Sequence, residues 1–193
     1  MSMSSIKQPS LFIPHGGGPC FFMPDPHHIW TGMASFLQQL AGMLPEKPKA
    51  IIVVSGHWET GGFAFTGTAH PGLIYDYSGF PPDTYQLRYD VPGAPALAES
   101  AARLLLAAGL TASVDPVRGL DHGVFVPLKL VFPDADIPVI EMSVERNLDP
   151  ALHTTAGRAL APLSDEGILI IGSGMSFHNM RGYVDRQVVQ LPW

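Results

Sequence analysis

The stretch Ala50-Ile51-Ile52-Val53-Val54-Ser55-Gly56-His57 decides the fold. Its Ile and Val residues follow one another with no polar residue between them, which is typical of a strand buried on both faces. Such strands occur mainly in parallel sheets that are covered by helices on both sides. Apolar runs of the same character lie at residues 11–14, 138–144 and 167–171. We therefore expect these three runs and residues 50–55 to be strands of one sheet.

Segments with helical features alternate with these strands. Residues 30–44 carry apolar side chains at helical spacing, and residues 94–108 are rich in Ala and Leu. Residues 149–163 begin with an Asp-Pro pair that suits an N-cap and the first helical position. The order predicts an α/β fold of three layers, with a mostly parallel central sheet and helices on both faces. No repeat or linker is visible, so we expect a single catalytic-type domain over residues 1–193.

Composition narrows the class of protein. The formal net charge is -6 and 46% of the residues are hydrophobic, which argues against a nucleic-acid partner and for a buried core. The single cysteine, Cys20, rules out a disulfide within the chain and favours a reducing, cytoplasmic compartment. Residues 1–10 are polar, and no apolar run approaches the roughly 20 residues of a membrane span. We expect a soluble protein without a membrane partner.

Four of the eight histidines stand in distinctive settings, namely His15, His57, His122 and His178. His15, His57 and His178 each follow a predicted buried strand and lie beside glycine or a tight turn. Since ligands bind beyond the carboxyl ends of parallel strands, these three side chains should converge at one edge of the sheet. Imidazole is a common ligand of first-row metals, and a further histidine beside a metal can move protons near neutral pH. For His122 the sequence alone indicates only a loop position.

Less specific readings compete with this hypothesis. A lone buried histidine is most often a core residue with a hydrogen-bond partner. The remaining four histidines have weaker settings, and we interpret them as surface residues: His27, His28, His70 and His153. Cys20, between a proline and two phenylalanines, is expected to be packed and inert. The aromatic segment at residues 61–92 predicts short strands and loops over the site, either walling a ring pocket or simply packing.

Two other motifs suggest different functions, but the sequence lacks the further residues that those functions require. His15-Gly16-Gly17-Gly18 is similar to the oxyanion-hole turn of esterases, but no serine of the chain has glycine at both second-neighbour positions. The esterase hypothesis is therefore weak. Gly172-Ser173-Gly174 suits an anion cradle, yet it matches neither the dinucleotide fingerprint nor the P-loop.

Taken in order along the chain, five motifs resemble one family. They are Ile13-Pro14-His15-Gly16-Gly17-Gly18-Pro19, Val54-Ser55-Gly56-His57-Trp58-Glu59, Tyr75-Asp76-Tyr77-Ser78-Gly79-Phe80-Pro81, Arg118-Gly119-Leu120-Asp121-His122-Gly123 and Gly172-Ser173-Gly174-Met175-Ser176-Phe177-His178-Asn179. This set is similar to the class III extradiol ring-cleavage dioxygenases, closest to the 4,5-DOPA extradiol dioxygenase branch. The resemblance runs from about residue 11 to residue 181 and is specific for the family rather than for the substrate.

The resemblance implies a non-haem metal enzyme that opens a catechol-type aromatic ring with O₂. It implies Fe(II) for catalysis, with Zn(II) often found in its place, and no organic cofactor. His15 and His57 would be metal ligands. His178 would be the general base and acid or an additional ligand, and His122 would contact the substrate or dioxygen.

Family members usually continue beyond the His-Asn motif into a segment that supplies the remaining ligand, whereas this chain ends at Trp193. The resemblance therefore leaves the ligand set to be completed by His178 or by a carboxylate such as Glu59 or Asp121. Two alternatives remain open: a truncated, non-catalytic relative that binds zinc or an aromatic ligand, and a zinc hydrolase. A monomer and a homodimer are both compatible with the sequence.

Overall fold

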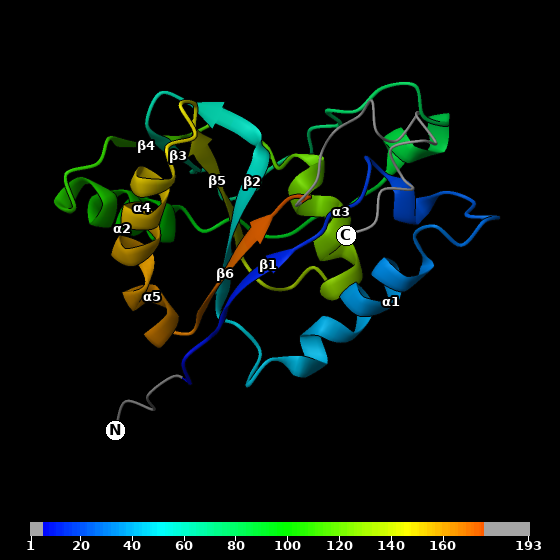
Figure 1. Cartoon of the computed structure of the whole chain (residues 1–193), viewed down its shortest axis with the longest axis horizontal. Coiled ribbons are helices and arrows are strands. Elements are labelled where there is room, and N and C mark those ends of the chain that lie inside the picture. Colours follow the sequence, from blue (N-terminus) through cyan, green and yellow to red (C-terminus); the bar gives the residue numbers. More distant parts are fainter. Residues whose placement is uncertain (1–5, 176–193) are drawn as a thin grey trace, which may run out of the picture.

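A six-stranded sheet forms the centre of the computed structural model, which describes residues 6–175 (Figure 1). Its strands are β1 (Ser10–Ile13), β2 (Ala50–Thr60), β3 (Phe63–Thr66), β4 (Ala112–Asp115), β5 (Val139–Glu145) and β6 (Ile168–Ser173). Their order across the sheet is β1-β6-β2-β5-β3-β4. Neighbouring strands run parallel except β3 and β5, which are antiparallel. The prediction of a mostly parallel sheet is confirmed.

Helices cover both faces of this sheet. In Figure 1, α1 (Thr31–Leu40) and α3 (His122–Val131) lie to the right of the sheet, and α2 (Pro95–Ala107), α4 (Pro150–Leu160) and α5 (Pro162–Asp165) lie to its left. Short 3₁₀ turns are η1 (Cys20–Phe22), η2 (Ala41–Met43) and η3 (Pro82–Gln86). The predicted three-layer α/β class is thus confirmed. Among the residues described, no helix is long and apolar enough to cross a membrane.

The run of Ile and Val in β2 is continuous because both faces of the strand are buried. Ile51 and Val53 pack in the core beneath α1 and α3, while Ile52 packs in the core beneath α2 and α4. All three side chains have no exposed surface. Burying an aliphatic side chain of this size contributes about 1.5–3 kcal/mol, so the central strand is a major stabilising element of both cores.

The structure corrects three sequence-based expectations. β2 extends to Thr60 instead of ending at residue 55, and the predicted helix at 149–163 divides into α4 and α5 before Pro162. The position of His122 in a loop is wrong, because His122 is the first residue of α3. The sequence did not predict this helix for two reasons. It is buried on nearly all sides and so lacks an amphipathic pattern, and it contains Pro127, a residue that usually breaks helices.

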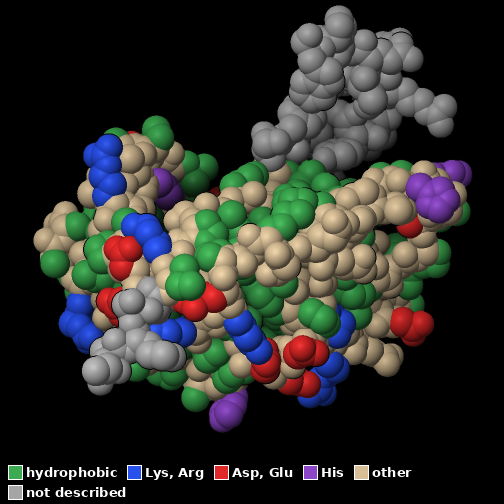
Figure 2. Space-filling model, turned by 90° about the horizontal axis from the view of Figure 1, so that it is seen from below, with side chains coloured by type: hydrophobic (Ala, Val, Ile, Leu, Met, Phe, Trp, Pro, Cys, Tyr) green, Lys and Arg blue, Asp and Glu red, His purple; other side chains and the backbone are tan. Residues whose placement is uncertain are grey.

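Charged side chains on the surface are mixed by sign. Figure 2 shows one face on which Lys and Arg lie beside Asp and Glu, without a broad patch of either sign among the side chains drawn in colour. Ion pairs on the surface include Lys7 with Asp165 and Lys47 with Asp136. Exposed pairs of this kind contribute little to stability, at most about 1 kcal/mol each.

Candidate functional site

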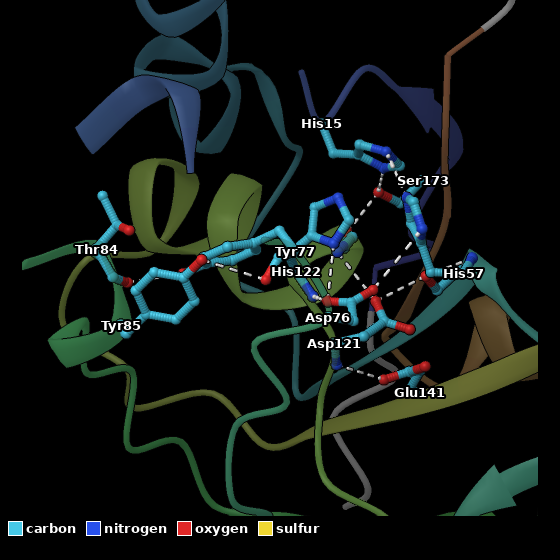
Figure 3. Close-up of polar contacts among 12 residues, drawn as sticks. His15, His57, Asp76, Tyr77, Thr84, Tyr85, Asp121, His122, Glu141 and Ser173 are labelled. Carbon is cyan, nitrogen blue, oxygen red and sulfur yellow. Dashed lines mark hydrogen bonds and ion pairs between the residues drawn. The ribbon is translucent and has the colours of Figure 1, made fainter. Parts of the chain in front are cut away.

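Three of the predicted histidines meet in one group (Figure 3). His15 follows β1, His57 lies within β2, and His122 begins α3. The Nε2 atoms of His15 and His57 are 3.0 Å apart, and the ring centroids of His57 and His122 are 4.0 Å apart. One ligand atom from each of the three residues lies within 4.8 Å of the others. His178 lies outside the described residues.

The turn after β1 sets the position of His15. Gly16 and Gly18 have φ angles of 75° and 54°, in the left-handed region that favours glycine. A Cβ atom at Gly16 would lie 2.3 Å from the Sγ of Cys20, so the turn also has no room for a side chain there. His15 is only 2% exposed, and its ring faces the other two histidines.

His57 lies where β2 departs from regular pairing. The register between β2 and β5 shifts between Val54 and Glu59, as in a β-bulge, and bulges re-aim side chains near active sites. The next residue, Trp58, is buried beneath the guanidinium of Arg118, whose Cζ lies 4.3 Å from the ring centroid. The side chain of His57 stays 26% exposed and is therefore accessible from the pocket.

Asp76 orients His122. One carboxylate oxygen, Oδ1, accepts hydrogen bonds from the backbone N–H of His122 at 3.0 Å and from its Nδ1 at 2.8 Å. The other oxygen lies 3.7 Å from Nδ1 of His57. Burial raises the pKa of Asp76, but the hydrogen bonds and charge of His122 outweigh it, so the pKa falls below its ordinary value. An ionised Asp76 keeps the proton of His122 on Nδ1 and its lone pair on Nε2.

A buried ionic group lies beneath the histidines. The guanidinium of Arg118 donates to Asp121 and to Glu141, both at 3.2 Å, and the backbone N–H of Asp121 donates to Glu141 at 3.0 Å. Asp121 and Glu141 have no exposed surface. Burial, followed by the side chain and the charge of Asp121, raises the pKa of Glu141 well above its ordinary value, although the backbone N–H of Asp121 and the charge of Arg118 act to lower it. The raised pKa favours the protonated form of Glu141 beside the ion pair of Arg118 and Asp121.

The histidines open onto a pocket of about 620 Å³. His57 and His122 line it together with Asp76 and with residues of the aromatic segment and of the turn after β1. Its apolar wall contains Met23, Pro24, Ile29, Trp30, Tyr77 and Phe80. A pocket of this size and lining suits an aromatic ring with a substituent.

The aromatic segment serves both of the purposes expected for it. Tyr77 and Phe80 line the pocket, and their rings meet edge to face. The hydroxyl of Tyr75 instead donates to the backbone oxygen of Leu87 at 2.6 Å, which is a packing role. Burial and its neighbouring tyrosines raise the pKa of Tyr77 to about 12, and its hydroxyl donates to a backbone oxygen. Tyr77 therefore acts as a wall rather than as an acid.

The donor set fits a metal ion. Zinc binds imidazole nitrogens at about 2.0–2.1 Å, so two such ligands of one ion lie roughly 3.0–3.4 Å apart, as the Nε2 atoms of His15 and His57 do. Asp121 is engaged by Ser55, Gly123 and Arg118 and does not join the histidine group. Glu59 is exposed on β2 and does not join it either.

The remaining histidines divide into two kinds. His27, His28 and His70 are exposed, as predicted, although His27 also lines the pocket. His153 is half-buried, and its Nε2 accepts a hydrogen bond from the backbone N–H of Glu145 at 3.1 Å. It is thus partly packed rather than fully exposed, unlike the other three.

Sequence reasoning missed two acidic residues of the site. Asp76 was interpreted only as part of an aromatic rim, and the signal for it is a lone carboxylate between two tyrosines. Glu141 lies in an otherwise apolar strand, where a single carboxylate indicates a buried partner.

Comparison with known proteins identifies the family to which the chain belongs. The sequence model described as "Catalytic LigB subunit of aromatic ring-opening dioxygenase" matches residues 10–187. The chain is 41% identical to the "4,5-DOPA dioxygenase extradiol" of Beta vulgaris, covering 100% of this chain and 70% of that protein. It is 46% identical to "Dioxygenase tasH" of Hapsidospora irregularis, covering 90% of this chain and 55% of that protein.

A solved structure shares the fold of this chain. The uncharacterized protein JW3007 from Escherichia coli K12 superposes with a TM-score of 0.63 at 37% identity, covering 77% of this chain and 55% of that one. The "4,5-DOPA dioxygenase extradiol" of Escherichia coli K12 is 39% identical over 179 residues, which are 63% of its length. The chain thus spans little more than half of several proteins that it matches.

Proposed function

Because the chain belongs to the family of catalytic LigB subunits of aromatic ring-opening dioxygenases, we propose that it opens a catechol-type ring outside its two hydroxyls, using O₂. The observation that carries the proposal is the convergence of His15, His57 and His122, two of which, His57 and His122, line an aromatic pocket. The relatives named as extradiol dioxygenases support the reaction type.

We propose that His15 and His57 hold a metal ion, Fe(II) in catalysis or Zn(II) in its place, with His178 as the third ligand or as the proton carrier. When bound, the ion supplies Lewis acidity to the diol and an electron path to dioxygen. No organic cofactor is proposed. The separation of the two Nε2 atoms supports the first two ligands, and the role of His178 rests on its motif.

Other residues of the pocket would bind the substrate and accept its proton. The side chains of Trp30, Tyr77 and Phe80 bind the ring and exclude water from it. His122 presents its Nε2 lone pair, because Asp76 holds its Nδ1 proton, so this ring is arranged to accept a proton from a bound hydroxyl. Asp76 then stabilises the imidazolium that results.

Further expectations from the sequence stay predictions. They are a single catalytic-type domain over residues 1–193, a cytoplasmic location, no nucleic-acid or membrane partner, and a monomer or homodimer. A zinc hydrolase is a second candidate, since three histidines are also the ligand set of some hydrolytic zinc sites.

Metal content and oxygen uptake test the proposal together. The purified chain, loaded with Fe(II), should bind about one ion and consume O₂ with a simple catechol while a yellow ring-opened semialdehyde forms. His57→Ala should lose the bound metal and the oxygen uptake, whereas the matched control His70→Ala, at an exposed histidine, should keep both.

Three outcomes would contradict parts of this scheme. Full metal occupancy in His57→Ala would remove His57 from the ligand set. A metal-loaded wild type that hydrolyses esters without oxygen, and leaves catechols intact, would favour the hydrolase. In His178→Ala, retained metal with ring opening at the wild-type rate would exclude His178 as the acid and base.

A further inference from the structure

Two serines occupy matching positions on neighbouring strands beneath the site. Ser55 of β2 and Ser173 of β6 are direct partners in the parallel register. Both are buried, at 0% and 3% exposure, and both reach the first turn of α3. Each also contacts one of the proposed metal ligands, so the pair connects three segments that are distant in sequence.

The hydrogen-bond pattern of Ser173 fixes the proton of His15. The Oγ of Ser173 donates its hydrogen bond to the carbonyl oxygen of Gly123, because a carbonyl oxygen can only accept. Since a serine hydroxyl has one hydrogen, Ser173 can only accept from Nδ1 of His15, which lies 3.0 Å away. The neutral ring then carries its proton on Nδ1 and its lone pair on Nε2, the atom nearest to Nε2 of His57.

Ser55 connects the backbone of His57 to the start of α3. Its Oγ accepts from the backbone N–H of His57 at 3.2 Å and donates to Oδ1 of Asp121 at 2.8 Å. The same oxygen of Asp121 caps α3 by accepting from the N–H of Gly123 at 2.9 Å. One serine thereby fixes the bulged strand relative to the helix that begins with His122.

Gly123 at the start of α3 packs closely against Ser55 and His57, and this packing limits how far the helix can move relative to β2. A Cβ atom on Gly123 would lie 2.6 Å from the Oγ of Ser55 and 3.2 Å from Cδ2 of His57. The absence of a side chain on Gly123 thus lets the start of α3 pack directly against Ser55.

We propose that Ser173 and Ser55 are positioning residues of the metal site: Ser173 selects the tautomer of His15 that offers Nε2 to a metal ion, and Ser55 sets the spacing between His57 and His122. This inference rests on the proposed metal site for its effect on binding. The tautomer of His15, in contrast, can be read in the metal-free chain.

The first test is the ¹⁵N NMR spectrum of the histidine rings in the full, metal-free chain. Wild type should show His15 with a protonated Nδ1, and Ser173→Ala should shift its population toward protonated Nε2. Ser55→Ala should leave this signal as in wild type, and Ser173→Thr, which retains the hydroxyl, should restore it. A wild-type tautomer in Ser173→Ala, with the fold confirmed by near-UV circular dichroism, would overturn the role of Ser173.

The second test is the dissociation constant for Zn(II) alone. Removing a group that orients a ligand typically weakens metal binding by about 10–100-fold, and we expect this loss in both Ser55→Ala and Ser173→Ala. Ser143→Ala is the matched control, because Ser143 is equally buried but bonds Thr60 and Ala64 instead of the histidines. Equal affinities in Ser55→Ala and Ser143→Ala would overturn the role of Ser55. A wild type that binds no zinc would refute the metal site itself, while the NMR result would still decide the tautomer.

Discussion

Replacing Glu141 with Gln tests the buried ionic group by the pH dependence of stability. Glu141 is fully buried and accepts from the backbone of Asp121 and from the guanidinium of Arg118. Its raised pKa means that the folded protein keeps this proton at a pH where the unfolded chain has released it. Gln is uncharged in both states and so lacks this linkage.

The sign and the size follow from proton counting. In the unfolded chain a Glu ionises near pH 4.3, so between about pH 5.5 and the folded pKa the unfolded state binds up to one proton fewer at this position than the folded state. The free energy of unfolding of the wild type then falls with rising pH, by at most about 1.4 kcal/mol per unit from this group. The contribution is complete below the unfolded pKa and is lost as the pH rises toward the folded pKa.

The assay is urea unfolding of both proteins at intervals between pH 5.5 and 6.5. The difference in unfolding free energy, Glu141→Gln minus wild type, should increase over this unit of pH, by at most about 1.4 kcal/mol. Any constant offset from altered hydrogen bonds does not affect this slope. Glu59→Gln makes the same chemical change at an exposed side chain of β2 and is the matched control. A difference for Glu141→Gln that stays flat with pH would refute a proton held on Glu141.

Three further predictions concern Gly123 and Asp76, which adjoin His122, and Gly157 in α4. Gly123→Ala should lower the free energy of unfolding by about 1–3 kcal/mol, because the new Cβ would lie 2.6 Å from the Oγ of Ser55; urea unfolding would show whether the helix start can move instead. Gly157→Ala in α4, where nothing lies within 4 Å of the added Cβ, should raise it by about 0.5–1 kcal/mol. Asp76→Asn should lower kcat for catechol opening by about 10–100-fold while KM changes little, and an unchanged kcat would limit Asp76 to packing.

The buried strands were predictable because their signal is local. A run such as residues 50–54 has to be covered on both faces, and the alternation with helical segments then leaves few topologies other than a layered α/β fold. Helix α3 was not predictable in the same way. Pro127 argues against a helix locally, and only its nearly complete burial in the core overrides that preference.

The residues of the candidate site were also predictable only in part. The expectation that His15 and His57 would meet came from the rule that parallel strands present their carboxyl ends at one edge, and the structure brings these residues together. The membership of His122 did not follow from that rule, because its place depends on the capping of α3 by Asp121 and on the contact with Asp76.

By itself, the sequence determined the layered fold, the buried strands and the residue types that can hold a metal, since these depend on periodicity and on the chemistry of single side chains. Only the tertiary structure decided which carboxylate orients which histidine, that burial raises the pKa of Glu141, and that Ser55 and Ser173 lie side by side. Each of these contacts joins residues from separate strands and helices. The distances between such segments depend on how the whole chain packs, and they cannot be predicted from a local sequence pattern.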